Sequence, residues 1–133
     1  MLTPWFLSID YALRIHRSSI ENYGGLDGVR DMGLLQSALA MPQSSFDGKW
    51  LHNDLFEMAA AYLFHIVQNH PFVDGNKRTG ASAAIIFLSM NDFEIEADEN
   101  GLFDLTVAVA SGKVGKPEIA EFFRRRAPPQ TDE

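Results

Sequence analysis

Two neighbouring segments of the chain have the apolar periodicity of helices, and a short polar loop separates them. The first segment begins after a cap at Asn53 or Asp54 and ends near Asn69, with apolar residues at three- and four-residue spacing. The second segment, residues 77–91, is apolar on nearly all sides, which predicts a buried central helix. Two adjacent helices of this kind have to pack against each other or against further helices.

The remaining pattern predicts four more helices, over residues 9–23, 32–41, 100–112 and 116–126. Ser8 and Asp31 are the expected N-caps of the first two, and Pro42 ends the second. Residues 42–50 are expected to form a loop, and the alternation in residues 93–97 is typical of one short strand. One strand cannot build a sheet, so the predicted fold class is all-α, a compact bundle of about six helices with at most one short strand or hairpin.

Length and composition indicate a single domain with a packed core. The chain has 133 residues, of which 46% are hydrophobic and 22% charged. The predicted domain covers residues 1–127, and residues 128–133 are expected to form a frayed tail.

The net charge of −7 argues against direct nucleic-acid binding as the main activity. The absence of cysteine excludes disulfides, thiolate metal sites and a cysteine nucleophile. The N-terminal sequence lacks the basic region of a signal peptide, and the longest apolar run, residues 83–88, is too short to span a bilayer. We therefore expect a cytoplasmic protein that does not interact with membranes.

The polar loop, "NHPFVDGNKRTG", has the features of an anion site at a helix start. The first N–H groups of a helix have no intrahelical partner and carry a partial positive charge. Gly75 and Asn76 tolerate positive φ, so the backbone can present N–H groups to an anion. Lys77 and Arg78 are unfavourable at a helix start unless an anion compensates them, and phosphate is the obvious candidate.

Two further residues of the loop suggest the chemistry. Asp74 can hold Mg²⁺ beside phosphates, because Mg²⁺ prefers oxygen ligands and takes few from the protein. His70 can be neutral and basic near pH 7, which makes it a candidate general base for a hydroxyl nucleophile. Together these residues indicate nucleotide-dependent transfer to a hydroxyl.

Structural alternatives exist for several of these residues. His70 alone could be a helix C-terminal cap, and a metal site formed by His65, His70 and Asp74 is conceivable, although its spacing matches no zinc pattern. His16 and His52 are interpreted as structural or exposed. The remaining structural interpretations are a helix-end role for the basic run 124–126 and core positions for Phe87, Phe103, Phe122 and Phe123.

The sequence "HPFVDGNKR" resembles the signature loop of the Fic/Doc superfamily, H-x-F-x-D/E-G-N-x-R. The flanking stretches "NYGGLDGVRDMGLLQSALAMPQ" and "DLTVAVASGKVGKPEIAEFFRRR" resemble Doc-type (death-on-curing) toxins, so the resemblance covers nearly the whole chain. The resemblance implies the all-α Fic/Doc fold. It also implies the following roles: His70 as catalytic base, Phe72 as a core plug, Asp74 as Mg²⁺ ligand, Gly75 and Asn76 as anion hole, and Lys77 and Arg78 as ligands of the nucleotide phosphates.

The chain departs from the Fic-type pattern at two positions. AMP-transferring Fic proteins carry Gly at the position of Lys77 and a second Arg at that of Ala81, whereas Doc-type proteins resemble this chain at Lys77. The Doc resemblance implies an ATP- and Mg²⁺-dependent kinase that phosphorylates a threonine of elongation factor Tu and arrests translation. AMP transfer to a protein hydroxyl is the alternative, and an inactive binding module that keeps the loop as scaffold is a third interpretation.

The resemblance also implies partners. Some Fic proteins inhibit themselves with an S/T-x-x-x-E-G/N helix, but Arg17 and Ile95 stand four residues before the two Glu-Asn pairs, so neither pair fits. Inhibition by a separate antitoxin of the prevents-host-death type is therefore implied. The stretch Leu26–Gly33 is expected near the mouth of the site, where a target peptide could dock.

Overall fold

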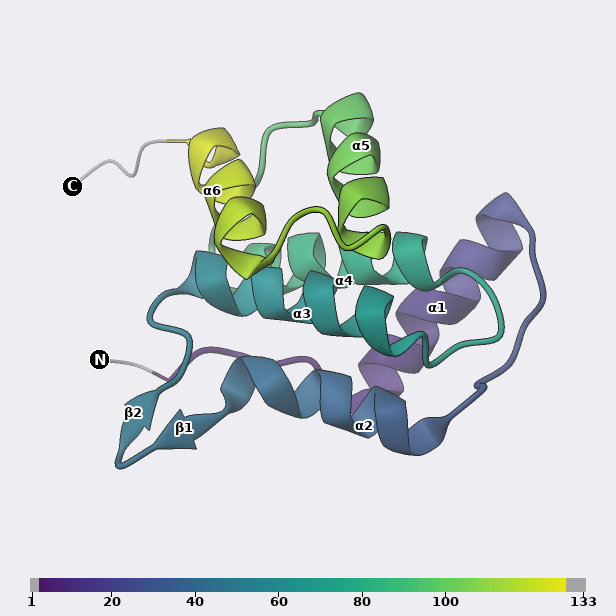
Figure 1. The fold of residues 1–133 in the computed structure, drawn as a ribbon, viewed down its shortest axis with the longest axis horizontal. Helices are drawn as coiled ribbons and strands as arrows, with labels where there is room; N and C mark the ends of the chain where they lie inside the picture. The colour runs from purple at the N-terminus through teal and green to yellow at the C-terminus, as the bar shows by residue number, and fades with distance from the viewer. Residues whose placement is uncertain (1–2, 129–133) are drawn as a thin grey trace.

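The computed structural model describes residues 3–128, and these residues form six α-helices and one very short hairpin (Figure 1). In chain order the elements are α1 (Ile9–Tyr23), α2 (Met32–Ala40), the 3₁₀ turn η1 (Met41–Gln43), β1 (Ser45–Phe46), β2 (Lys49–Trp50), α3 (Leu55–Asn69), α4 (Asn76–Met90), α5 (Glu99–Ala110) and α6 (Lys116–Arg126). The predicted all-α fold class is confirmed. The expected frayed tail lies outside the described residues except for Pro128.

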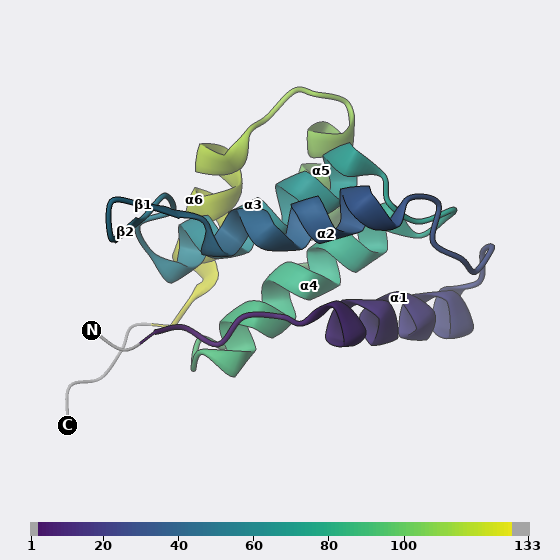
Figure 2. The same cartoon turned by 90° about the horizontal axis from the view of Figure 1, so that it is seen from below.

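Helix α3 lies at the centre of the bundle and packs against α2, α4, α5 and α6 (Figure 1). Helix α1 packs on α4, on the side away from α3, so that α4 is covered by helices on two sides (Figure 2). The segment predicted as the central helix, α4, is buried as expected, but α3 contacts more of the other elements. No helix among residues 3–128 has the length and apolar character needed to cross a membrane.

The close approach of α3 and α4 depends on small residues. Ala59, Ala60 and Ala61 of α3 are fully buried. On α4, a Cβ atom at Gly80 would lie only 3.0 Å from Val67 Cγ2 and 3.2 Å from the backbone oxygen of Leu63. Gly80 therefore allows the two helices to meet next to the loop that joins them.

The helix starts follow the predicted caps. Ser8, Asp31 and Asp54 each accept a hydrogen bond from the backbone N–H three residues later. Asp98 caps α5 in the same way, accepting from the N–H of Gly101 at 3.0 Å.

The prediction of a strand over residues 93–97 is wrong. This segment is irregular, and the N–H of Glu96 is hydrogen-bonded to the backbone oxygen of Arg126, at the end of α6. The short hairpin forms instead within residues 45–50, where a loop was expected. Asp47 and Gly48 both adopt positive φ, 53° and 76°, which is the conformation that Asp-Gly favours in a two-residue hairpin turn.

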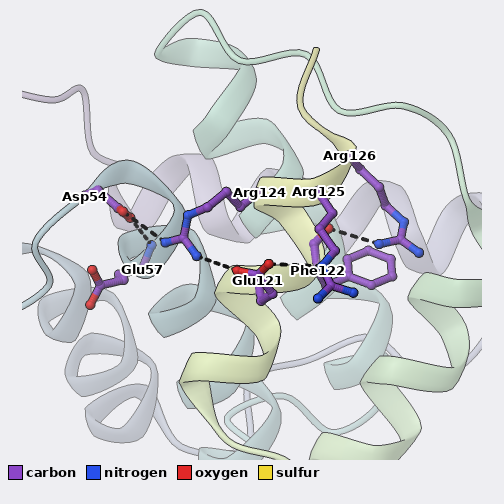
Figure 3. Close-up of polar contacts among 7 residues, drawn as sticks. All are labelled: Asp54, Glu57, Glu121, Phe122, Arg124, Arg125 and Arg126. Carbon is purple, nitrogen blue, oxygen red and sulfur yellow. Dashed lines mark hydrogen bonds and ion pairs between the residues drawn. The ribbon is translucent and has the colours of Figure 1, made fainter. Parts of the chain in front are cut away.

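The basic run at the end of α6 forms ion pairs within the chain (Figure 3). Arg124 contacts Asp54 at 3.0 Å and Glu121 at 2.8 Å, which connects α6 to the start of α3. Arg126 donates from Nε to Asp98 at 2.8 Å, which connects the end of α6 to the start of α5. These pairs support the structural interpretation of the run.

We predict that Gly80→Ala lowers the free energy of unfolding by about 1–3 kcal/mol, because the added methyl group forces α3 and α4 apart at Val67 and Leu63. Urea unfolding followed by circular dichroism measures this change. Gly33→Ala is the matched control: it is also helical, but its Cβ meets only the side chain of Asp31. A Gly80→Ala variant as stable as the control would contradict the prediction.

Candidate functional site

The loop between α3 and α4 is closed by residues in the left-handed conformation at both ends. His70 ends α3 with φ 51° and ψ 53°, and its N–H is bonded to the backbone oxygen of Ile66. Gly75 is the N-cap of α4 with φ 78°. These two residues change the direction of the backbone at the two ends of the loop. The predicted site residues therefore lie on one tight turn.

Phe72 anchors the loop in the core, as the resemblance implied. Its side chain is fully buried and stacks face to face on the ring of His16 from α1, with the ring centroids 3.9 Å apart. His16 is itself buried. A structural role for His16 is one of the two that the sequence left open, but the sequence carries no signal for this contact, because the contact joins residues that are 56 positions apart.

Asn76 closes the loop with its side-chain amide. Oδ1 accepts the N–H of Phe72 at 2.9 Å, and Nδ2 donates to the backbone oxygen of the same residue at 3.0 Å. These two bonds fix which end of the amide is the donor. Nδ2 also lies 3.1 Å from Nδ1 of His70, so Nδ1 accepts a hydrogen bond and a neutral His70 ring carries its proton on Nε2.

The segment between α1 and α2 runs along the loop and supports it. Val29 forms an isolated antiparallel bridge with Phe72, and the N–H of Arg30 is bonded to the backbone oxygen of Pro71 at 2.7 Å. The Arg30 side chain donates to the backbone oxygen of His70 at 2.7 Å. The segment lies beside the loop, as expected, but none of residues 26–33 lines the cleft described below, and the docking of a target peptide there stays a prediction. The contact of Arg30 with His70 was not predicted.

Asp74 is exposed at the loop surface and is held by backbone N–H groups. Oδ2 accepts the N–H of Leu26 at 3.2 Å and Oδ1 that of Gly75 at 2.9 Å. These two hydrogen bonds lower the pKa of Asp74, and the nearby charges of Arg78 and Lys77 add to the effect. Asp74 is therefore ionised at neutral pH.

The first turn of α4 is the positive end of a helix. Its N-cap, Gly75, has no side chain to accept a hydrogen bond, and the first intrahelical bond joins the N–H of Thr79 to the oxygen of Gly75. The N–H groups of Asn76, Lys77 and Arg78 are thus available to an anion, whereas that of Gly75 is bonded to Asp74. Lys77 and Arg78 are exposed beside them, and the Arg78 guanidinium lies 4.8 Å from the ring centroid of Tyr23.

A cleft of about 460 Å³ joins this helix start to α5. Five of the six predicted site residues line it: Asp74, Gly75, Asn76, Lys77 and Arg78. His70 is not part of the lining and connects to the cleft through its contact with Asn76.

The opposite wall of the cleft comes from α5 and combines the apolar Leu102, Phe103 and Val107 with Glu99 and Thr106, while Tyr23 contributes from α1. The expectation that Phe103 belongs to the core is wrong, since its side chain is 66% exposed. An apolar residue on a helix is as compatible with a cleft wall as with a core, so periodicity could not separate the two. The wall brings apolar surface close to the cationic helix start.

The conceivable metal site of His65, His70 and Asp74 is not formed. His65 points to α6 instead, and its Nε2 lies 3.1 Å from the Lys116 ammonium. Nε2 of His52 lies 3.3 Å from the same ammonium. In the described part of the chain, no three acidic or histidine side chains are grouped so that they could hold a metal. His52 is buried, in agreement with the structural interpretation.

The fold and the loop geometry together define a class of protein: the chain belongs to the Fic/DOC family, whose family model matches residues 6–88. This range extends from before α1 nearly to the end of α4 and includes the whole loop.

Two characterised relatives are similar to the chain. It is 34% identical to the protein kinase doc of Escherichia phage P1 over 119 residues, which cover 90% of this chain and 93% of that protein. It is 45% identical to the toxin Doc of Mycolicibacterium smegmatis over 76 residues, which cover 57% of this chain and 58% of that protein.

We predict that the stability of the protein falls as the pH is lowered from about 6.5 towards 4. Burial, followed by the charge of Lys116, lowers the pKa of His65 to about 4, and burial also lowers the pKa of His52. The unfolded chain therefore binds protons that the folded chain excludes, and the stabilisation is complete only above about pH 6.5.

The measurement is urea unfolding of the wild type and His65→Gln between pH 7.5 and 5. The glutamine does not titrate and keeps an acceptor for Lys116, so the pH dependence should become shallower. The slopes of the unfolding free energy against pH should differ between the two proteins by less than about 1.4 kcal/mol per pH unit, which is the limit for one proton. Identical slopes for the two proteins would contradict the prediction.

Proposed function

We propose that this protein is the toxin of a toxin–antitoxin module and that it transfers the terminal phosphoryl group of ATP to a hydroxyl of a protein, with elongation factor Tu as the target. The observation that carries the proposal is the cleft in which the unpaired start of α4, two cations and the ionised Asp74 face a largely apolar wall from α5, which also carries Glu99 and Thr106. The names of the two relatives, a protein kinase and a toxin, support the same activity.

The cleft has separate regions for the two ends of a nucleotide. The backbone N–H groups at the start of α4, with Lys77 and Arg78, bind the phosphates. The apolar side chains of Phe103 and Val107 on the opposite wall suit the flat face of a base. This division supports a binding mode in which the reacting phosphate lies at the loop rather than at α5.

Asp74 fits the role of a Mg²⁺ ligand. It is ionised, exposed and at the phosphate end of the cleft, and each of its oxygens has further acceptor capacity beyond its one backbone hydrogen bond. One carboxylate is enough, because Mg²⁺ is commonly bound through one or two carboxylates plus substrate phosphates. The ion would neutralise charge on the phosphates during transfer.

His70 is the proposed base that accepts the proton of the attacking hydroxyl, while the oxygen bonds to the terminal phosphorus and ADP leaves. Asn76 holds Nδ1 as an acceptor, so the resting neutral ring carries its proton on Nε2. To accept a proton at Nε2, the ring has to move its own proton to Nδ1 and give up the bond from Asn76. The proposed reaction therefore includes a rearrangement of the ring, which the bound substrates have to stabilise.

Phosphoryl transfer is favoured over AMP transfer by the cation at the first turn of α4. Lys77 occupies space and adds charge where the AMP-transferring pattern has glycine, and Ala81, which also lines the cleft, offers no second cation. Both differences favour a placement of the nucleotide that differs from its placement in AMP-transferring proteins. AMP transfer to a protein hydroxyl is the second candidate function.

The proposal includes control by a separate antitoxin of the prevents-host-death type and a cytoplasmic location, where both ATP and translation factors are present. An inhibitory S/T-x-x-x-E-G/N segment does not occur around either Glu-Asn pair of the chain. The name of one relative, the toxin Doc of Mycolicibacterium smegmatis, supports a module with a partner.

The test is incubation with elongation factor Tu, Mg²⁺ and ATP labelled at either the γ- or the α-phosphate. We expect the γ label on the target and none from the α position, with a mass increase of one phosphate. His70→Ala should reduce the rate by at least about 100-fold, because it removes the base. An AMP-sized addition would establish the second candidate, and a fully active His70→Ala variant would reject the base.

We also predict that Lys77→Gly reduces phosphoryl transfer at least about tenfold, because the variant loses the cation that orients the phosphates. Steady-state rates with γ-labelled ATP measure the effect. Lys113→Gly removes another exposed lysine, in the turn after α5, and serves as the control for net charge. Undiminished transfer by Lys77→Gly would show that this lysine does not orient the nucleotide.

A further inference from the structure

We propose that His16 of α1 is a positioning residue for the phosphate-binding turn, acting through the peptide group between Asp74 and Gly75. The inference rests on the proposed function, because it assigns the orientation of this peptide to nucleotide binding. His16 lies beneath the loop, and its Nε2 is 2.8 Å from the backbone oxygen of Asp74.

The direction of this hydrogen bond is fixed by its partners. A backbone oxygen only accepts, so Nε2 of His16 carries the proton and donates. The ring cannot easily turn away, because it is 2% exposed and stacks on Phe72 with an angle of 4° between the ring planes. Its other nitrogen, Nδ1, lies 3.8 Å from the Asp27 carboxylate.

The orientation of one peptide group matters here because its two polar atoms point in opposite directions. In a trans peptide, an oxygen directed at the buried His16 directs the N–H of Gly75 away from the interior. This N–H is bonded to Oδ1 of Asp74, so the same peptide also holds the proposed Mg²⁺ ligand.

Gly75 makes the peptide free to rotate if the donor is lost. Glycine adopts positive and negative φ at similar cost, so Gly75 alone does not determine which way the Asp74–Gly75 peptide faces. A flipped peptide would direct its oxygen towards the cleft, where it would repel phosphate, and would release Oδ1 of Asp74. We therefore assign to His16 the selection of the peptide orientation that admits an anion.

The test separates the donor of His16 from its packing. His16→Phe keeps an aromatic ring against Phe72 but has no donor, and His16→Gln keeps an N–H donor without the ring. We expect the affinity for ATP with Mg²⁺, measured by calorimetry, to fall about tenfold in His16→Phe, as for one lost hydrogen bond, and to recover partly in His16→Gln. The KM for ATP should rise correspondingly, with a smaller change in kcat.

Ile15→Val is the matched control, because Ile15 is the neighbouring buried residue of α1 and its truncation lowers stability but removes no hydrogen bond to the loop. Its affinity for ATP should equal that of the wild type. A folded His16→Phe variant with wild-type affinity, or an equal loss of affinity in Ile15→Val, would overturn the assignment.

Nuclear magnetic resonance of the nucleotide-free protein keeps this test independent of the proposed function. In the wild type, the His16 ring should show a proton on Nε2, and the amide signal of Gly75 should shift in His16→Phe. An unprotonated Nε2, or an unchanged Gly75 signal, would overturn the assignment even if a variant unfolds or the wild type binds no ATP. Failure of the wild type to bind ATP would reject the proposed function and the link to nucleotide binding, whereas the two resonance results would still decide whether His16 sets the orientation of the peptide.

Discussion

The hydrogen bonds of one buried amide, that of Asn76, hold the turn on which the rest of the site depends. The amide satisfies both backbone groups of Phe72 and contacts His70, so a single side chain connects the core plug, the candidate base and the first residue of α4. Leaving such buried backbone groups unpaired would be costly. This side chain therefore closes the loop in one conformation and brings the end of α3 and the start of α4 together.

That turn lies where three parts of the chain meet. Helices α3 and α4 approach closely at Gly80, the segment between α1 and α2 pairs with the loop through Val29, and α1 inserts His16 beneath it. Each of these contacts fixes the backbone around the turn rather than the charged side chains on its surface. The charged groups Lys77 and Arg78 consequently stand on a rigid support, which reduces the cost of ordering the site when a ligand binds.

Much of the site could be predicted because it is contiguous. Asp74 to Arg78 lie within one turn and line one cleft, so residues that are close in sequence are also close in space. His16 and Arg30 could not be predicted, since each reaches the loop from a distant part of the chain.

Two predictions from periodicity are wrong: the core position of Phe103 and the strand over residues 93–97. An apolar helix position and an alternating segment do not reveal their neighbours.

The sequence by itself determined the helices, their caps and the polar loop between α3 and α4, because these depend on local periodicity, side-chain hydrogen bonding and backbone preference. The tertiary structure alone decided which surfaces face that loop: the apolar wall of α5, the supporting segment before α2 and the imidazole under Asp74. Contacts between distant segments depend on how whole helices pack, and packing is selected by the fit of many side chains together, which no short stretch of sequence contains.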